Sequence, residues 1–318
     1  IKWNGTNWVP GDIEESASST QKAIFGFGYT NSTTNITNLV SSSGVVASDT
    51  TGVGTARRGL AAAGFGGDKA IFGFGNNNGN VTNVTNLVSS SGVVATDTTG
   101  VGTSRANLAA ASYDSDKAIF GFGVNGSSIY TSVTNLVSSS GVVATDQTGV
   151  GTARFALAAA SYGGDKALFG FGSTGSSTSI TNLVSNAGVV ATDTTGVGTA
   201  KEGLAAASYG GDKAMFGFGI EDGAYSSYTN VTNLVSNLGV VATDTTGVGT
   251  ARYSLAASGY GGDKAIFGFG AIQDVNYGGD DAVNMTNLVS NTGVVSSDVT
   301  GVGLARYNLA AAGYSTTA

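Results

Sequence analysis

The chain of 318 residues contains no cysteine and no histidine. These absences exclude disulfide bonds, thiolate or imidazole metal sites, and nucleophilic chemistry that needs Cys or His, Ser-His-Asp triads included. Proline occurs once, and the 51 glycines follow no collagen-like period, so the chain is not fibrous. No apolar run approaches the ~20 residues of a membrane span, and no basic-then-apolar signal peptide is present. Because the first residue is Ile rather than Met, we expect a processed chain or part of a longer polypeptide.

Positive charge is also scarce, and the formal net charge is −7. Most charged residues recur at fixed places in a repeat, where cations and acids nearly cancel. The excess acid lies in the N-terminal segment and at positions that vary between repeats. A groove that binds phosphates needs the opposite sign, so we expect no nucleic-acid partner.

What the chain does contain is one phrase repeated six times. The phrase Lys-Ala-Ile-Phe-Gly-Phe-Gly, with Leu or Met replacing Ile in two copies, begins at lysines spaced 47–51 residues apart: Lys22, Lys69, Lys117, Lys166, Lys213 and Lys264. Each copy continues with Thr-Asn-Leu-Val-Ser and Gly-Val-Val, and then with a cation before Leu-Ala-Ala. A period in the forties that is rich in Gly and β-forming residues predicts an all-β propeller with one four-stranded antiparallel blade per repeat.

Residues 57–103 illustrate the four strands that we expect in one blade. Strand A covers Leu60–Phe65, strand B Lys69–Gly75, strand C about Val84–Ser90, and strand D begins at Val93. A Gly-Gly-Asp segment of the kind that tight hairpins prefer joins A to B. Ala-rich A strands suit the centre of a ring, where only small side chains leave room.

The order of the segments predicts how the ring closes. The last A strand, Leu309–Tyr314, has no B strand after it, and the first B strand, Lys22–Gly28, has no good A strand before it. We expect these two segments to pair, which completes six blades and removes open edges. The predicted domains are therefore a non-repeating leader at residues 1–20 and a propeller at residues 21–318.

The unit resembles the kelch repeat. Arg252 to Ala256, then Gly261-Gly262-Asp263 and Lys264 to Gly270, lie where kelch has Arg, an apolar strand, a turn and a strand ending in Gly-Gly. Val stands at the kelch Trp position, and Asn-Leu-Val replaces the segment with the kelch Tyr. The resemblance covers about residues 21–318 and implies kelch-like blades. The amino-acid sequence of the repeat is also similar to tandem arrays in structural proteins of marine tailed phages.

All length variation between repeats falls between strands B and C, where the inserts have 8, 9, 10, 8, 12 and 15 residues. In an up-and-down blade this connection and the segment after the repeated cation emerge on one side, which we call the loop face. Variable loops on a rigid repeat scaffold are typical of a recognition surface, although unconstrained loops also drift. The two longest inserts, 220–231 and 271–285, are expected to be neighbours in the ring.

These two inserts differ from the shorter ones because they carry tyrosines and acids. Exposed Tyr is a rigid contact residue that also forms hydrogen bonds. The residue after the repeated cation varies too, and is Tyr in two copies. The predicted ligand-binding residues are Tyr225, Tyr228, Tyr277, Glu221, Asp222, Asp274, Asp280, Asp281, Tyr253 and Tyr307. Asp274, Asp280 and Asp281 could hold calcium together with loop carbonyls. Their spacing matches no known calcium loop, so we predict no metal or other cofactor.

The repeated cations are expected to form a cationic ring around the channel on the loop face, where they could hold an anion or acidic sugar. The ring would consist of Arg57, Arg105, Arg154, Lys201, Arg252 and Arg306. Sixfold repetition is what scaffold residues show, so the sequence favours a structural role, in which each cation pairs with a repeated carboxylate or a carbonyl. The candidate carboxylates are Asp49, Asp97, Asp146, Asp193, Asp244 and Asp298.

The pattern of polar residues predicts no enzyme. Propeller enzymes place acid–base pairs, metal ligands or nucleophiles around the channel, whereas the channel-side positions here are Ala, Gly and a repeated cation. The alternative is a glycan-acting hydrolase that uses Glu202 with Glu221 or Asp274, which needs carboxyl groups ~5–10 Å apart.

We therefore expect an extracellular or virion-borne binding module, such as the head of a phage tail fibre, that recognises a host-surface glycan or protein. Residues 1–20, with Trp3 and Trp8, would attach it to other virion or appendage proteins. The alternatives are a purely structural or decorating virion component and an intracellular kelch-type adaptor.

Overall fold

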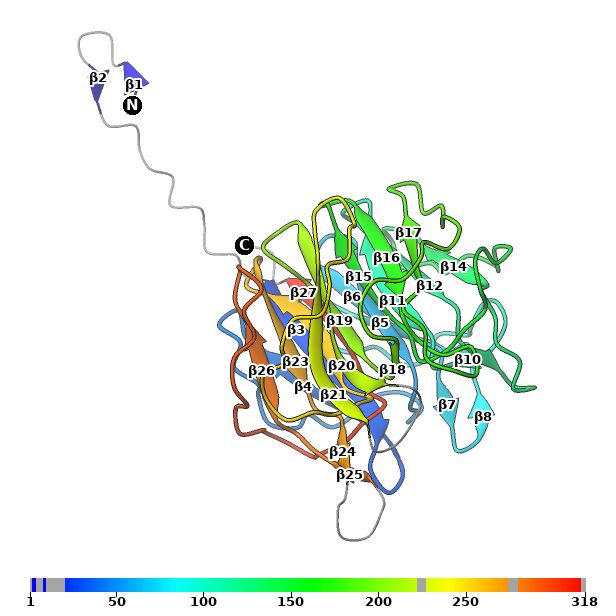
Figure 1. Cartoon of the computed structure of the whole chain (residues 1–318). Coiled ribbons are helices and arrows are strands. Elements are labelled where there is room, and N and C mark those ends of the chain that lie inside the picture. Colours follow the sequence, from blue (N-terminus) through cyan, green and yellow to red (C-terminus); the bar gives the residue numbers. More distant parts are fainter. Residues whose placement is uncertain (1, 4–7, 10–20, 222–226, 274–279, 316–318) are drawn as a thin grey trace.

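The computed structural model describes residues 2–3, 8–9, 21–221, 227–273 and 280–315, which form an all-β structure (Figure 1). Six antiparallel sheets of the same build follow one another, each with three main strands that we call inner, middle and outer. In that order, the first sheet consists of β27 (Ala310–Ser315), β3 (Gln21–Tyr29) and β4 (Thr33–Val40), and the second of β5 (Ala61–Phe65), β6 (Lys69–Gly73) and β9 (Thr85–Val88). The third consists of β11 (Ala109–Tyr113), β12 (Lys117–Gly121) and β14 (Thr134–Val137), and the fourth of β15 (Ala158–Tyr162), β16 (Lys166–Gly170) and β17 (Thr181–Val184). The fifth consists of β19 (Ala205–Tyr209), β20 (Lys213–Glu221) and β21 (Tyr228–Val235), and the sixth of β22 (Ala256–Tyr260), β23 (Lys264–Gly268) and β26 (Thr286–Val289).

Short strands extend the sheets on the loop face. They are β7 (Asn76–Asn77) with β8 (Asn80–Val81), β10 (Arg105–Ala106) with β13 (Val124–Asn125), β18 (Lys201–Glu202) with the end of β20, and β24 (Ala271–Gln273) with β25 (Asp280–Ala282). β10 and β18 each begin with a repeated cation and pair with the start of an insert. In the other four sheets a single bridge replaces this pairing: Tyr29 with Tyr307, Arg58 with Asn76, Phe155 with Ser173 and Tyr253 with Ala271. The residue after each repeated cation thus lies beside the start of an insert. Figure 1 shows β7, β8, β24 and β25 on the same lower side of the molecule.

The middle strands are buried on both faces because each sheet packs between two others. In β6, Ile71 and Phe72 are fully buried. A Cβ placed on Gly73 would lie 2.8 Å from Cζ of Phe120 in the next sheet, so the first glycine of the repeated phrase makes room for that ring. Six phenylalanine contacts, with ring centroids 5.0–5.2 Å apart, join each sheet to the next: Phe25–Phe269, Phe27–Phe72, Phe74–Phe120, Phe122–Phe169, Phe171–Phe216 and Phe218–Phe267.

A closed cycle of backbone hydrogen bonds joins the six sheets at the loop face. Each ring residue donates its N–H to the carbonyl oxygen of the ring residue in the preceding sheet at 2.7–2.8 Å, and the sixth bond returns to the first. All six have φ between 50° and 62°, in the left-handed region that is strained for residues other than glycine. The ring residues are Gly59, Asn107, Ala156, Gly203, Ser254 and Asn308.

The two ends of the repeat region meet in the first sheet. β27 pairs with β3 in the register Ala310↔Gly26 to Ser315↔Gln21, so the expected pairing of the last segment with the first is confirmed. The inner strand β27 also contacts the inner strands β22 and β5 on either side. The inner strands therefore form a continuous ring.

The fourth strand that the sequence predicts is not a regular strand. In the second sheet, the segment that follows β9 meets it only at two isolated bridges, Val88 with Val94 and Thr85 with Thr98. Between these bridges the segment advances four residues and β9 advances three, so a continuous ladder cannot form. The side chain of Asn86 donates to a backbone carbonyl between the bridges at 3.0 Å. The expectation of four-stranded units is wrong in this respect.

The predicted leader is described only in part. β1 (Lys2–Trp3) pairs with β2 (Trp8–Val9), and Trp3 lies opposite Trp8. The other residues of the segment, and with them its expected attachment role, lie outside the described residues. In the part of the chain that the structure describes, no helix is long and apolar enough to cross a membrane.

Candidate functional site

The repeated cations do not line a channel. Each of the six is 0% exposed, so the expectation of a cationic ring around the channel is wrong. A buried cation is stable only where acceptors replace its hydration, and here the sheets supply those acceptors. The residues concerned are Arg57, Arg105, Arg154, Lys201, Arg252 and Arg306.

Arg57 shows how the acceptors are arranged. Its Nε donates to the carbonyl of Phe74 at 2.8 Å, its Nη2 to Oδ1 of Asn86 at 2.6 Å, and its Nη1 to the carbonyl of Thr55 at 3.1 Å. The guanidinium carbon lies 4.3 Å from the centroid of the Phe27 ring in the preceding sheet, a cation–π contact. Burial lowers the pKa of Arg57 to about 10. Its donors are used within the scaffold.

The repeated aspartate fastens the same corner. Asn86 donates its amide to Oδ1 of Asp97 at 2.9 Å, and the Thr55 hydroxyl donates to Oδ2. Burial raises the pKa of Asp97, but the hydrogen bonds from Thr55 and Asn86 outweigh it and leave the pKa below its usual value. Nη1 of Arg57 is 4.0 Å from Oδ1 of Asp97. This is the structural role that the sequence favours for the repeated cations.

Lys201 occupies the same corner in the fifth sheet with one nitrogen in place of three. Its Nζ donates to Oδ1 of Asn233 at 2.7 Å and to the carbonyl of Val231 at 3.4 Å. Desolvation by burial lowers the pKa of Lys201 to about 8.

The two longest inserts meet on the loop face, as expected. Tyr228, at the start of β21, and Tyr253, beside β24, both donate their hydroxyls to Asp280 at the start of β25; the Tyr253 Oη–Asp280 Oδ2 distance is 2.6 Å. The two rings lie 5.1 Å apart, centroid to centroid. Burial and the hydrogen bond to Asp280 raise the pKa of Tyr253 above its usual value. The fifth and sixth sheets thus share one cluster.

Two more tyrosines continue this cluster into the first sheet. The Tyr307 ring centroid lies 6.5 Å from that of Tyr253 and 5.5 Å from that of Tyr29. The guanidinium carbon of Arg58 lies 4.3 Å from the Tyr29 centroid. We call Tyr228, Tyr253, Tyr307 and Tyr29 the tyrosine row. It crosses three sheets and ends on an arginine of a fourth.

Arg58 also lines a cavity of about 350 Å³ between the second and third sheets, which we call the Arg58 pocket. The remaining lining includes Asn76, Ala106, Asn107, Asn125 and Asn308. Sequence reasoning missed Arg58, Tyr29 and these amides as site residues. A signal was present, because Arg58 is the single arginine outside the repeated set and occupies a position that varies between repeats.

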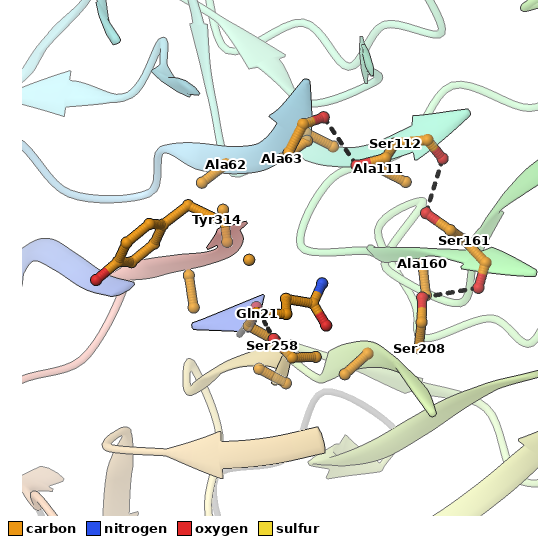
Figure 2. A pocket seen from close by; sticks show the side chains of 18 of the residues that line it. Gln21, Ala62, Ala63, Ala111, Ser112, Ala160, Ser161, Ser208, Ser258 and Tyr314 are labelled. Atoms are coloured by element: carbon orange, nitrogen blue, oxygen red, sulfur yellow. Dashed lines mark hydrogen bonds between the residues drawn. The ribbon is translucent and has the colours of Figure 1, made fainter. Parts of the chain in front are cut away.

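A second cavity, of about 270 Å³, lies between the inner strands (Figure 2). Alanine and serine side chains line it, and Gln21 points into it. The Ser161 hydroxyl donates to the carbonyl of Ser112 at 2.7 Å, and that of Ser208 to the carbonyl of Ser161 at 2.8 Å. These hydroxyls thus form hydrogen bonds to the backbone of the preceding inner strand. Like the buried cations, they are used within the scaffold.

Of the carboxylate pairs that the hydrolase alternative could use, the structure describes only Glu202 with Glu221. Glu202 lies opposite Ile220, and Lys201 lies opposite Glu221, in the short pairing of β18 with β20. Since successive side chains in a strand point to opposite faces, Glu202 and Glu221 face away from each other. The other carboxylate of this alternative, Asp274, lies outside the described residues.

Of the ten predicted ligand-binding residues, the structure brings together Tyr228, Tyr253, Tyr307 and Asp280. Asp281 is exposed on β25, and Glu221 ends β20. Among the described residues, no group of three or more carboxylates is placed to hold a metal ion. The predicted residues that lie outside the described ranges are Asp222, Tyr225, Asp274 and Tyr277.

No protein-family model matches this chain, and no curated protein matches its sequence. Its function is therefore inferred from the loop face and the repeat alone.

Proposed function

We propose that the chain is a six-bladed, kelch-like β-propeller that serves as a non-enzymatic binding module, extracellular or borne on a virion, such as the head of a phage tail fibre. It recognises a host-surface glycan or protein through the loop face. Residues 1–20 attach it to other virion or appendage proteins. The observation that carries this proposal is the tyrosine row, because its rings lie on neighbouring sheets at positions that differ between repeats.

The rest of the molecule supports this division of roles. The ring of inner strands, the cycle of ring residues and the buried cations make a scaffold whose polar groups are paired internally. Such a scaffold holds the loop face rigid, which limits the entropy lost on binding. Tyrosines present a large contact area with few rotatable bonds, and their hydroxyls suit the polar surface of a sugar or protein.

A purely structural or decorating role is the second candidate, and one observation favours it. The first valine of each Gly-Val-Val segment is 64–66% exposed, at the same place in all six sheets. A repeated, exposed apolar side chain is suited to packing against another protein. These residues are Val45, Val93, Val142, Val189, Val240 and Val294.

Adsorption measurements separate the two roles. A variant with Tyr228→Ala, Tyr253→Ala and Tyr307→Ala is compared with the parent on candidate host cells and on a glycan array. The matched control carries Tyr130→Ala and Phe155→Ala, a ring pair with centroids 4.7 Å apart on the same face but outside the row. We expect a loss of about tenfold or more in the row variant and little change in the control. Unchanged adsorption of the row variant favours the structural role.

A further inference from the structure

The Arg58 pocket lies next to the tyrosine row and has the size of a small-ligand site. Its volume of about 350 Å³ lies in the range of roughly 300–1,000 Å³ that small-molecule sites occupy. One cation and four asparagines line it, and none of the described lining residues is a carboxylate. The pocket is thus positively charged in a chain whose net charge is −7.

The Arg58 guanidinium differs from those of the repeated arginines. The ring of Tyr29 holds it at 4.3 Å, centroid to guanidinium carbon. Among the described residues, it forms no ion pair and donates no hydrogen bond to the protein. A guanidinium has five N–H donors in a planar fork, and all of them remain available at this site.

Two of the four asparagines, Asn76 and Asn125, offer donors rather than acceptors to the pocket. Oδ1 of Asn76 accepts the N–H of Gly79 at 2.8 Å, and Oδ1 of Asn125 accepts the N–H groups of Ser127 and Ile129 at 3.0 Å. These bonds occupy the amide oxygens and leave the Nδ2 groups without a partner among the described residues. Together with the Arg58 guanidinium, these amides make the pocket rich in donors. A ligand that fits it must be rich in acceptors.

We propose that the Arg58 pocket binds the carboxylate-bearing unit of an acidic sugar. This inference rests on the proposed function, because it names the ligand class of the same loop face. A carboxylate matches the guanidinium fork in a bidentate pair. One arginine balances the single charge of a carboxylate, whereas a phosphate near its second ionisation carries more. Sugar hydroxyls accept from the amides, and the adjoining tyrosine row would contact further units of the glycan.

The shape of the pocket depends on the third sheet. Ala106 there occupies the position that Arg58 has in the second sheet and Phe155 in the fourth, so a methyl group stands where other copies have a long side chain. The variant Ala106→Phe should fill the cavity without removing Arg58. The fold already accommodates Phe at this position in the fourth sheet, which makes the variant a test of occupancy rather than of folding.

The test is a titration of the protein with glucuronate, glucose or inorganic phosphate, each in a separate experiment monitored by ligand-observed NMR. We expect glucuronate to bind about tenfold or more tighter than glucose. Arg58→Gln and Ala106→Phe should each weaken glucuronate binding by about tenfold or more. The control Phe155→Ala should leave it unchanged, and all variants should melt near the parent.

Three outcomes overturn the inference: equal binding of glucuronate and glucose, glucuronate binding that survives Arg58→Gln, or tighter binding of phosphate than of glucuronate. These failures differ from failure of the proposed function. Adsorption to cells that depends on the tyrosine row but not on Arg58 retains the binding module and removes the acidic-sugar site. Specific glucuronate binding by a protein that adsorbs to no candidate cell retains the pocket and removes the cell-surface role.

Discussion

Arg57 and Arg58 are neighbours in the sequence, and their surroundings are opposite. Arg57 is 0% exposed and donates to acceptors from three segments of the second sheet. Arg58 is half-buried, stacks on Tyr29 and lines a cavity. The first belongs to a set repeated six times, and the second has no counterpart in the other copies. Repetition thus marks residues whose polar groups are used internally, and departure from it marks groups left for a ligand.

The same contrast separates the scaffold from the loop face as a whole. Repeated asparagines, aspartates and inner-strand serines bond to backbone or to the buried cations. The tyrosine row is built from positions that are Ala, Glu, Phe or Arg in other copies, or that lie in inserts of different length. Changes on the two sides should therefore have different consequences, in stability on one and in binding on the other.

The largest expected effect breaks the scaffold itself. Deletion of residues 309–318 removes β27, which pairs with β3 and contacts the inner strands on both sides. The exposed edge of β3 and the gap between β22 and β5 should prevent a cooperative, monomeric fold. Calorimetry and size-exclusion chromatography report both properties. A truncated protein that melts like the parent would mean that the ring does not depend on its last strand.

The next effect compares the two neighbouring arginines directly. Arg57→Met leaves the buried Phe74 carbonyl and Asn86 amide oxygen without their donor, which should lower the free energy of unfolding by about 3 kcal/mol. Arg58→Met removes no hydrogen bond within the described protein and should change it by about 0.5 kcal/mol or less. Urea unfolding of both variants gives the two values. Equal losses would contradict the division between scaffold and site.

A smaller effect, on the pH dependence of stability, is expected from Lys201, the lysine among the repeated cations. Lys201 has a folded pKa of about 8 against its usual 10.5, so between these values the unfolded chain binds more protons than the folded one. The free energy of unfolding should therefore rise with pH in this window, by about 1 kcal/mol between pH 7 and 9. Lys201→Arg should remove the rise, because the buried arginines of the set have pKa values of about 10. A rise that persists in this variant would assign it to another group.

The sequence predicted the features that depend on order along the chain. The pairing of Leu309–Tyr314 with Lys22–Gly28 followed from an unpaired segment at each end, and the cluster of Tyr228 with Asp280 followed from the neighbouring long inserts. The burial of Arg57 could not be predicted in this way. It depends on the convergence of Phe74 and Asn86, 17 and 29 residues away, in one corner.

Two further features could not be predicted from the repeat sequence. The Arg58 pocket exists because Ala106, from the next sheet, leaves space beside Arg58. The fourth segment is irregular because it advances one residue more than β9 does between their two bridges, and composition does not reveal such a difference. Strand type and order follow from the sequence of one repeat, whereas this cavity depends on two repeats packed together and the register on how two segments of one repeat align.

The most direct test of the division between scaffold and site is a variant in which every residue after a repeated cation is alanine, as Ala106 already is. It carries Arg58→Ala, Phe155→Ala, Glu202→Ala, Tyr253→Ala and Tyr307→Ala. Melting and adsorption to the cells or glycans that the parent binds are measured on the same preparation. We predict a single cooperative transition, as in the parent, with adsorption abolished. A variant that melts cooperatively and adsorbs as well as the parent would contradict the assignment of binding to the loop face.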